Sequence, residues 1–202
     1  MYEVEMKFRL TAPEAFEAKA AELFGVRLGA PRVEADLYFQ RVSRDFRETG
    51  EALRLRRVGG RLLITYKGPR RDRVVKTREE IELPLLSPGE DAPLEERKEA
   101  WIRLLTRLGY EPFAEIAKTR RSASFVFSGC TFSLTRDSLP DLGEFTEIET
   151  IIPGADEQIS AQNALKEAAA RMGLADPVFS SYLTLLLESR KGDARRAFPE
   201  SD

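Results

Sequence analysis

Histidine is absent from this sequence of 202 residues. Its absence excludes a serine–histidine–aspartate triad, a histidine general base and a zinc site held by imidazole nitrogens. Any catalysis must therefore use carboxylates, Lys, Arg, Tyr, Ser or Thr side chains, or a metal ion that is held by oxygen atoms.

Cysteine and long apolar segments are also scarce. The single cysteine, Cys130, rules out an internal disulfide framework and fits a reducing compartment. The sequence shows neither a signal peptide nor an apolar run approaching ~18 residues. We therefore expect a soluble, cytoplasmic protein.

Neither sign of charge dominates, because 32 Lys and Arg residues are balanced by 34 Asp and Glu residues. A net charge of −2 gives no general attraction to a polyanion. We therefore expect no nucleic acid and no membrane surface as a partner, although a balanced total can conceal a site in which the charges are segregated.

Charged residues alternate with apolar residues in the first predicted strand, which spans residues 2–10. Glu3, Glu5 and Lys7 occupy every second position, with apolar residues between them. Taken alone, this pattern is typical of a strand with one solvated face. Its meaning depends on whether other strands carry similar faces.

A pair of glycines, Gly59 and Gly60, predicts the turn of a hairpin and so determines its register. In this register Arg54 lies opposite Thr65, and Arg56 and Lys67 fall on the same face as Arg54. Three cations therefore project from one side of the hairpin.

A second hairpin follows from a turn at residues 128–129. It pairs Phe127 with Cys130 and places Arg120 directly opposite Asp137. Lys118 lies on the same polar face, which carries charges of both signs.

Two further predicted strands repeat the pattern, one over residues 76–85 and one over residues 144–152. Their charged faces carry the residues Arg78, Glu80, Glu82, Glu147 and Glu149. Helices are predicted behind the first strand with a capping box at Thr11 and Glu14, near 94–108, near 156–172, and after a cap at Ser180 or Ser181. The tail 190–202 is charged and is expected to be disordered, which leaves one domain over residues 1–189.

Seven or eight strands joined by hairpins or single helices indicate an α+β fold, an eight-stranded antiparallel β-barrel with helices packed on its outside. The charged faces would then line the interior, where each ion costs several kcal/mol unless it is paired. A triphosphate with Mg²⁺ or Mn²⁺ would balance these charges. The alternative is a purely structural network of internal ion pairs.

Several motifs carry a resemblance to a known family. They are ExExK at 3–7, DLYF at 36–39, ALRLRR at 52–57, ITYKGP at 64–69, REEIE at 78–82, AKTRRS at 117–122 and DSLPDLGEFTEIE at 137–149. In this order and strand phase the sequence resembles the CYTH family of triphosphate tunnel metalloenzymes, from residue 2 to about residue 187. The YEVEMKFR opening and the LGEFTEIE segment look most like class IV adenylyl cyclases.

This resemblance implies an eight-stranded tunnel, a divalent metal ion and a triphosphate substrate, with a possible homodimer. Carried over by position, the implied metal ligands are Glu3, Glu5, Asp137, Glu147 and Glu149. The implied triphosphate-binding residues are Lys7, Arg54, Arg56, Lys67, Lys118 and Arg120. Glu5, Glu147 and Lys67 would be catalytic, and Arg78, Glu80 and Glu82 would support the tunnel.

Three functions remain open at this point. The first is a cyclase that converts ATP to cyclic AMP and pyrophosphate. The second is a hydrolase of inorganic tripolyphosphate, thiamine triphosphate or a nucleoside triphosphate. The third is a non-catalytic polyphosphate or nucleotide binder, against which the large carboxylate set argues. The sequence identifies no residues that recognise an organic group.

Overall fold

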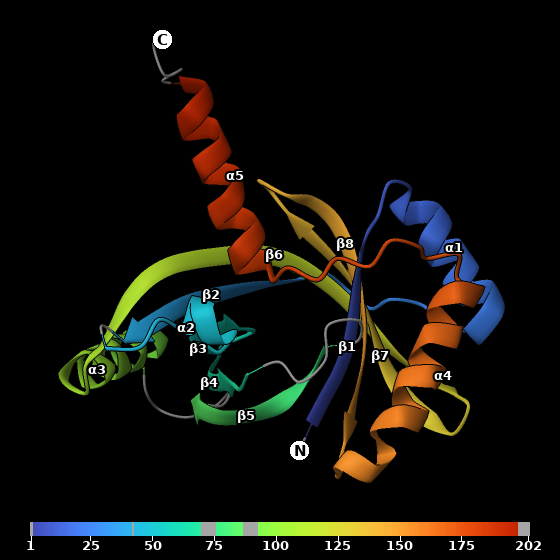
Figure 1. Ribbon diagram of the computed structural model, residues 1–202, viewed down its shortest axis with the longest axis horizontal. Helices are drawn as coiled ribbons and strands as arrows, with labels where there is room; N and C mark the ends of the chain where they lie inside the picture. Colours follow the sequence, from blue (N-terminus) through green and yellow to red (C-terminus); the bar gives the residue numbers. More distant parts are fainter. Residues whose placement is uncertain (1, 42, 70–75, 87–92, 198–202) are drawn as a thin grey trace.

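Eight antiparallel strands close into a barrel in the computed structural model, which describes residues 2–41, 43–69, 76–86 and 93–197 (Figure 1). The strands are β1 (Tyr2–Arg9), β2 (Arg32–Arg41), β3 (Ala52–Val58), β4 (Arg61–Lys67), β5 (Lys76–Leu86), β6 (Tyr110–Phe127), β7 (Cys130–Leu139) and β8 (Gly143–Ile152). Their order around the barrel is β1-β5-β4-β3-β2-β6-β7-β8, and β1 closes the ring by pairing with both β5 and β8. The predicted α+β barrel is therefore confirmed.

Both predicted hairpin registers are confirmed. Arg54 pairs with Thr65 across β3 and β4, and Arg120 pairs with Asp137 across β6 and β7. The glycines at the first turn have φ values of 53° and 76°, a region that favours glycine. The turn residues therefore determine which side chains face the interior.

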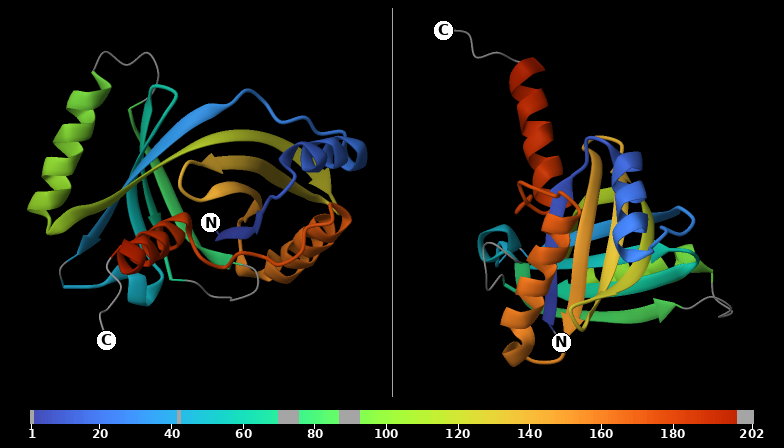
Figure 2. Two further views of the ribbon diagram at one scale, coloured as in Figure 1. Left: turned by 90° about the horizontal axis from the view of Figure 1, so that it is seen from above. Right: turned by 90° about the vertical axis from the view of Figure 1, so that its right-hand side faces the viewer.

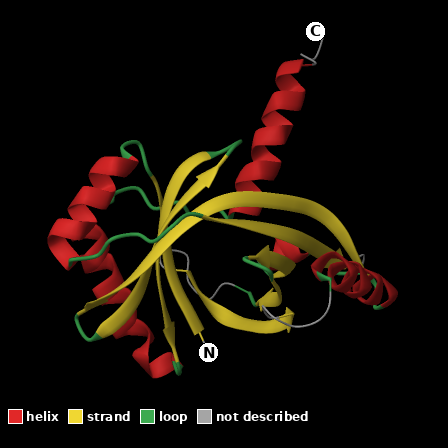
Figure 3. Ribbon diagram, turned by 180° about the vertical axis from the view of Figure 1, so that it is seen from behind, coloured by secondary structure: helices red, strands yellow, loops and turns green. Residues whose placement is uncertain are grey.

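The helices cover the outside of the barrel or stand at its end (Figures 1 and 2). They are α1 (Pro13–Phe24), α2 (Phe46–Thr49), α3 (Leu94–Arg107), α4 (Gln158–Arg171) and α5 (Tyr182–Ala197), with a 3-10 turn at Ala155–Glu157 before α4. Helices α1 and α4 cover the side formed by β1, β7 and β8. Helix α3 packs at the opposite end of the molecule, beside the long strand β6, which arches over the barrel (Figure 3).

Apolar side chains on the outer face of the barrel bind α1 and α4. Val4 and Phe8 of β1 pack with Ile148 of β8 and with Phe16 and Leu165 of the two helices. All five side chains are buried, so this layer removes a large apolar area from water. Because successive residues of a strand point to opposite faces, the charged residues of β1 and β8 are left to face the interior.

The first turn of α5 packs against apolar residues on the inner faces of β6 and β8. Phe145 shares the inward face of β8 with Glu147, and Ile116 shares the inward face of β6 with Lys118. These two apolar residues form a buried cluster with Tyr182 and Leu186 of α5. We call this cluster the apolar plug.

Two predicted details at helix ends differ in outcome. The expected capping box at Thr11 and Glu14 is wrong, because α1 has Ala12 at its N-cap and no side chain bonds to that end. Pro13 occupies the first turn, where a missing N–H costs nothing. The cap of α5 is Ser181, whose Oγ accepts a hydrogen bond of 3.1 Å from the Thr184 backbone N–H.

Helix α5 continues to Ala197, beyond residue 190, where the sequence predicts that a disordered tail begins. Residues 198–202 of that predicted tail lie outside the described residues, so the boundary of the domain at residue 189 stays a prediction. Among the helices that the structure describes, none combines the length and the apolar character needed to cross a membrane.

Candidate active site

The barrel encloses a cavity of about 1460 Å³ that is lined by side chains from all eight strands. Of the fourteen charged residues predicted to face inward, thirteen line this cavity, and Asp137 lies behind its wall. The prediction that the charged strand faces converge is therefore correct. The cavity mouth is formed by the segment around α2 and by the first two turns of α5.

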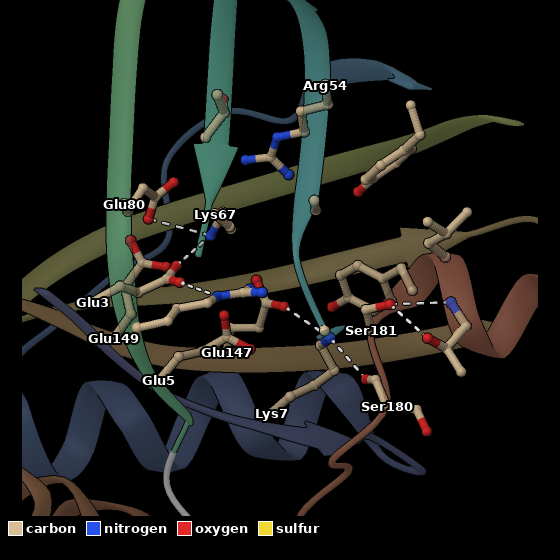
Figure 4. Close-up of a pocket in the computed structure, with 18 of the residues that line it drawn as sticks. Glu3, Glu5, Lys7, Arg54, Lys67, Glu80, Glu147, Glu149, Ser180 and Ser181 are labelled. Carbon is tan, nitrogen blue, oxygen red and sulfur yellow. Dashed lines mark hydrogen bonds and ion pairs between the residues drawn. The ribbon is translucent and has the colours of Figure 1, made fainter. Parts of the chain in front are cut away.

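Three of the five predicted metal ligands lie together at one end of the cavity (Figure 4). Glu3, Glu5 and Glu149 each offer an oxygen, and these atoms lie within 4.8 Å of one another. We call them the carboxylate group. Carboxylate oxygens are the ligands that Mg²⁺ and Mn²⁺ prefer, so the group fits a hard divalent cation.

The members of the carboxylate group differ in their electrostatic surroundings. Burial, followed by the negative charge of Glu3, raises the pKa of Glu149 to about 7. Burial would also raise the pKa of Glu3, but the positive charges of Lys67 and Arg78 hold it well below its usual value. Glu149 is therefore only partly ionised near neutral pH, whereas Glu3 is ionised and paired with cations.

The structure does not bring the other two predicted metal ligands into this group. Glu147 lies 3.3 Å from the Lys7 ammonium and is also bonded to Arg120. Asp137 is fully buried and accepts hydrogen bonds of 2.6 and 2.5 Å from the Arg120 guanidinium. Both carboxylates therefore pair with cations, and their role as metal ligands stays a prediction.

The predicted triphosphate-binding cations line the walls beside the carboxylate group. Lys67 Nζ lies 2.5 Å from Glu3 Oε1 and 3.2 Å from Glu80 Oε2 (Figure 4). Arg54 and Arg56 project from β3 towards the same cavity, as the glycine turn predicts. Guanidinium and ammonium groups in this number suit a ligand with several anionic oxygens.

Two carboxylates of β2, Glu34 and Asp36, are site residues that the sequence reasoning missed. Asp36 accepts two hydrogen bonds of 2.7 Å from Arg56 and one of 3.1 Å from Arg54. Glu34 Oε2 lies 3.4 Å from Arg56 and 3.5 Å from Lys118. Their alternation in VEADLYFQ was the available signal, but the register of β2 against β3, with Asp36 opposite Arg56, was needed to use it.

Burial and neighbouring cations act in opposite directions on these β2 carboxylates. Burial would raise the pKa of Glu34, but Arg56, Arg120 and Lys118 outweigh it and lower this pKa to about 2. Glu34 is therefore ionised at neutral pH, and it occupies the cations that a phosphate would need.

A further carboxylate at the cavity mouth, Glu51, holds the segment before β3 in place. Its oxygens accept hydrogen bonds from the Tyr66 hydroxyl at 2.5 Å and from the Thr49 hydroxyl at 2.6 Å, and Arg44 lies 2.6 Å away. The hydrogen bond to Glu51 raises the pKa of Tyr66 to about 12. This side of the mouth is thus fixed to the barrel wall.

A family model described as the CYTH domain matches residues 1–177. The chain belongs to the CYTH family. The match covers all eight strands of the barrel and ends before Tyr182, so α5 lies outside it. The predicted family resemblance is confirmed.

Two curated proteins are similar to this CYTH chain along nearly its whole length. A protein of Methanocaldococcus jannaschii that bears a provisional adenylate cyclase name is 30% identical over 187 residues, which cover 92% of this chain and 98% of that protein. Adenylate cyclase CyaB of Aeromonas hydrophila is 29% identical over 198 residues, which cover 93% of this chain and 90% of that protein.

Solved structures support the same CYTH fold. A protein of Pyrococcus horikoshii is 33% identical with a TM-score of 0.75, covering 93% of this chain and 99% of that one. A protein from Hippeastrum is 18% identical with a TM-score of 0.56, covering 94% of this chain and 96% of that one, and is described as having a dominant triphosphatase activity. At that identity the likeness concerns the fold alone.

Proposed function

We propose that this CYTH protein is a divalent-metal-dependent enzyme that converts ATP, held inside the barrel, to cyclic AMP and pyrophosphate. The observation that carries the proposal is the juxtaposition, in one buried cavity, of the carboxylate group with Lys7, Lys67 and the β3 arginines. The adenylate cyclase names of the two curated relatives support this reaction over others.

The size of the cavity favours a nucleoside triphosphate over an inorganic one. Small-molecule pockets commonly enclose about 300–1,000 Å³. The cavity, at about 1460 Å³, exceeds that range and has room for more than a triphosphate chain. The apolar side chains Phe179, Leu183 and Leu187 lie at its mouth and suit an organic group.

In the proposed reaction the oxygen of the ribose 3′ hydroxyl attacks the α-phosphorus. The bond from that phosphorus to the oxygen bridging to the β-phosphate breaks, and its electron pair leaves with pyrophosphate. The hydroxyl proton passes to a tunnel carboxylate or to water. Mg²⁺ or Mn²⁺ held by Glu3, Glu5 and Glu149 would supply positive charge that lowers the pKa of the attacking hydroxyl.

The cations of the chain itself have two tasks in this reaction. They bind the phosphate oxygens in a fixed geometry, and they neutralise the negative charge that grows on the leaving pyrophosphate. Lys67 adjoins the carboxylate group, so it is placed to contact a phosphate bound beside a metal ion. Arg54 and Arg56 line the same cavity from β3 and would bind the remaining phosphate groups.

A triphosphatase is the second candidate, in which the same residues direct water at a terminal phosphorus. The fold alone does not distinguish the two reactions, because the Hippeastrum protein combines this fold with a dominant triphosphatase activity. A non-catalytic binder is the third outcome. The carboxylate group opposes it, since negative groups weaken the binding of an anion unless they hold a metal ion.

The deciding experiment is product analysis of the purified protein with Mg²⁺ or Mn²⁺ and, in parallel, ATP, inorganic tripolyphosphate or thiamine triphosphate. Cyclic AMP and pyrophosphate from ATP are expected. Release of orthophosphate as the main product would replace the cyclase with the triphosphatase. Binding of all three ligands without any product would leave the non-catalytic binder.

A further inference from the structure

Tyr182, the first residue of α5, lies at the boundary between the apolar plug and the charged cavity. Its side chain is buried, and its ring packs edge-on against Phe145 with ring centres 5.2 Å apart. It also lines the cavity. Nothing in the sequence pattern marks this tyrosine as a site residue, and the CYTH family match ends five residues before it.

The hydroxyl of Tyr182 bonds to a carboxylate behind the cavity wall. It donates a hydrogen bond of 2.9 Å to Asp137 Oδ2. The same Oδ2 atom lies 3.3 Å from the Lys118 ammonium and 2.5 Å from the Arg120 guanidinium. Asp137 therefore shares its negative charge among a phenol and two cations that also line the cavity.

The ring of Tyr182 contacts the cations directly. The Lys7 ammonium lies 3.9 Å from the ring centre, and the Lys118 ammonium lies 5.1 Å from it. A cation within about 6 Å of an aromatic ring is attracted by the ring quadrupole, most strongly where water is excluded. One ring thus holds two of the predicted triphosphate-binding groups, which come from β1 and β6.

The chain that leads into α5 fixes the position of this ring. The Val178 backbone N–H donates a bond of 2.7 Å to the Lys7 carbonyl, and Lys7 Nζ donates one of 3.3 Å to the Ser180 carbonyl. Ser181 then caps the helix (Figure 4). Residues 178–181 are therefore tied to β1 beside the cation that Tyr182 contacts.

We propose that Tyr182 is a positioning residue of the site. Its hydroxyl takes up part of the Asp137 carboxylate that Lys118 and Arg120 also contact, and its ring sets the ammonium groups of Lys7 and Lys118 at the cavity surface. The inference rests on the proposed function only in taking a triphosphate as the ligand. It assigns to α5, which the family match does not include, a part in binding the anion.

The test measures the binding of inorganic tripolyphosphate in the presence of Mg²⁺ by calorimetry, using the full chain. Tyr182→Leu removes both the hydroxyl and the ring, and Tyr182→Phe removes the hydroxyl alone. From the usual strength of a buried cation–π contact and of a bond to a charged group, we expect Kd to rise about tenfold for Leu and about threefold for Phe. The affinity that Tyr182→Phe retains relative to Tyr182→Leu separates the contribution of the ring from that of the hydroxyl.

Leu186→Val is the matched control, because it loosens the same apolar plug at a residue that is not among those lining the cavity. It should lower the thermal unfolding temperature and leave Kd within about twofold, as expected when packing and ligand contacts are separate. If Tyr182→Leu fails to fold, Tyr182→Phe, which keeps the ring in the plug, still decides the role of the hydroxyl.

The outcomes separate this inference from the proposed function. If the wild type binds tripolyphosphate and both Tyr182 variants bind it with the same Kd, the inference is overturned and the proposed function stands. The same holds if Leu186→Val loses as much affinity as the Tyr182 variants. If the Tyr182 variants bind tripolyphosphate more weakly but the wild type does not turn over ATP, the inference is supported and the proposed enzymatic activity is overturned. A wild type that binds neither tripolyphosphate nor ATP would overturn both.

Discussion

Lys67 of β4 and Glu3 of β1 form a buried ion pair, with Nζ 2.5 Å from Oε1, although the two residues are 64 positions apart in the sequence. The pair joins a cation of the proposed triphosphate-binding set to a carboxylate of the proposed metal-binding set. Ion pairs of this kind let the two sets neutralise each other across the cavity. A metal ion and a phosphate that bind there must exchange these partners together, so variants of either set should affect both ligands.

The carboxylate group provides the first prediction. Glu5→Gln should weaken Mn²⁺ binding and lower turnover by about 100-fold or more, because an amide lacks the charge that a hard cation requires. Titration calorimetry with Mn²⁺ and a product assay measure the two effects. Glu79→Gln is the control, because Glu79 lies exposed on the outer face of β5. Full activity of Glu5→Gln would contradict the metal assignment.

Glu147 provides the second prediction, since the structure pairs it with Lys7 and Arg120 rather than with the carboxylate group. Glu147→Gln should also lower turnover by about 100-fold or more. The Mn²⁺ affinity of this variant then shows how Glu147 acts. A loss equal to that of Glu5→Gln would make Glu147 a metal ligand, whereas wild-type affinity would place its action at the two cations.

Arg56 provides the third prediction, in which stability and binding can be separated. Arg56→Ala should raise KM about tenfold or more by removing a phosphate ligand, and should destabilise the fold by roughly 3–5 kcal/mol because Asp36 is left buried without its bidentate partner. The double variant Asp36→Ala/Arg56→Ala should regain much of the stability and keep the high KM. A double variant with wild-type KM would show that Arg56 does not bind substrate.

Glu34 provides the fourth prediction, which concerns pH. Its pKa is lowered in the folded state, to about 2, so it contributes stability above its unfolded pKa, near 4.5, and that contribution is lost as pH falls from 4.5 towards 2. Glu34→Gln should unfold more readily at pH 7 and lose less of its stability on acidification. Urea unfolding at pH 7, 5 and 3 measures both effects.

The same Glu34→Gln variant should bind inorganic tripolyphosphate more tightly, because Arg56 and Lys118 lose an internal competitor. Calorimetry at one fixed ionic strength measures this change. Unchanged or weaker binding would show that Glu34 orients these cations for the ligand instead of competing with it.

Arg121 provides the fifth prediction, because it is out of phase with the inward residues of β6. It donates bonds of 2.7 and 2.8 Å to the Glu17 carboxylate of α1, on the outside of the barrel. Arg121→Ala should therefore leave KM and turnover unchanged and lower the free energy of unfolding by about 1 kcal/mol. A changed KM would place Arg121 within reach of the ligand.

Local sequence signals were sufficient for most of the barrel and for the inward cations. The turns at residues 59–60 and 128–129 set two registers by counting, and alternation then assigned a face to every residue of those hairpins. The convergence of Glu3, Glu5 and Glu149 followed from closure of the sheet. The two hairpin registers needed only neighbouring residues in the chain and the strand period.

Contacts between distant segments accounted for what the sequence missed. Glu34 is a site residue because it pairs with Arg56 of β3 and Lys118 of β6. Tyr182 is one because α5, which is distant in the sequence, packs against the apolar plug. Asp137 was assigned to the inward face correctly by phase, but its burial behind Arg120 and Tyr182 could not be read from phase alone. How deeply a side chain is buried depends on which residues from distant segments pack over it.

The closure of the ring through β1 also has a kinetic consequence. Glu3 pairs with Arg78 on one side and with Ile151 on the other, partners that lie 75 and 148 residues further along the chain. Proteins dominated by such distant pairings fold slowly, because the entropy of closing long loops is lost before the contacts compensate for it. The strand that bears Glu3 and Glu5 can acquire both its neighbours only after β8 has been synthesised, so the proposed metal site is expected to be among the last parts of the molecule to form.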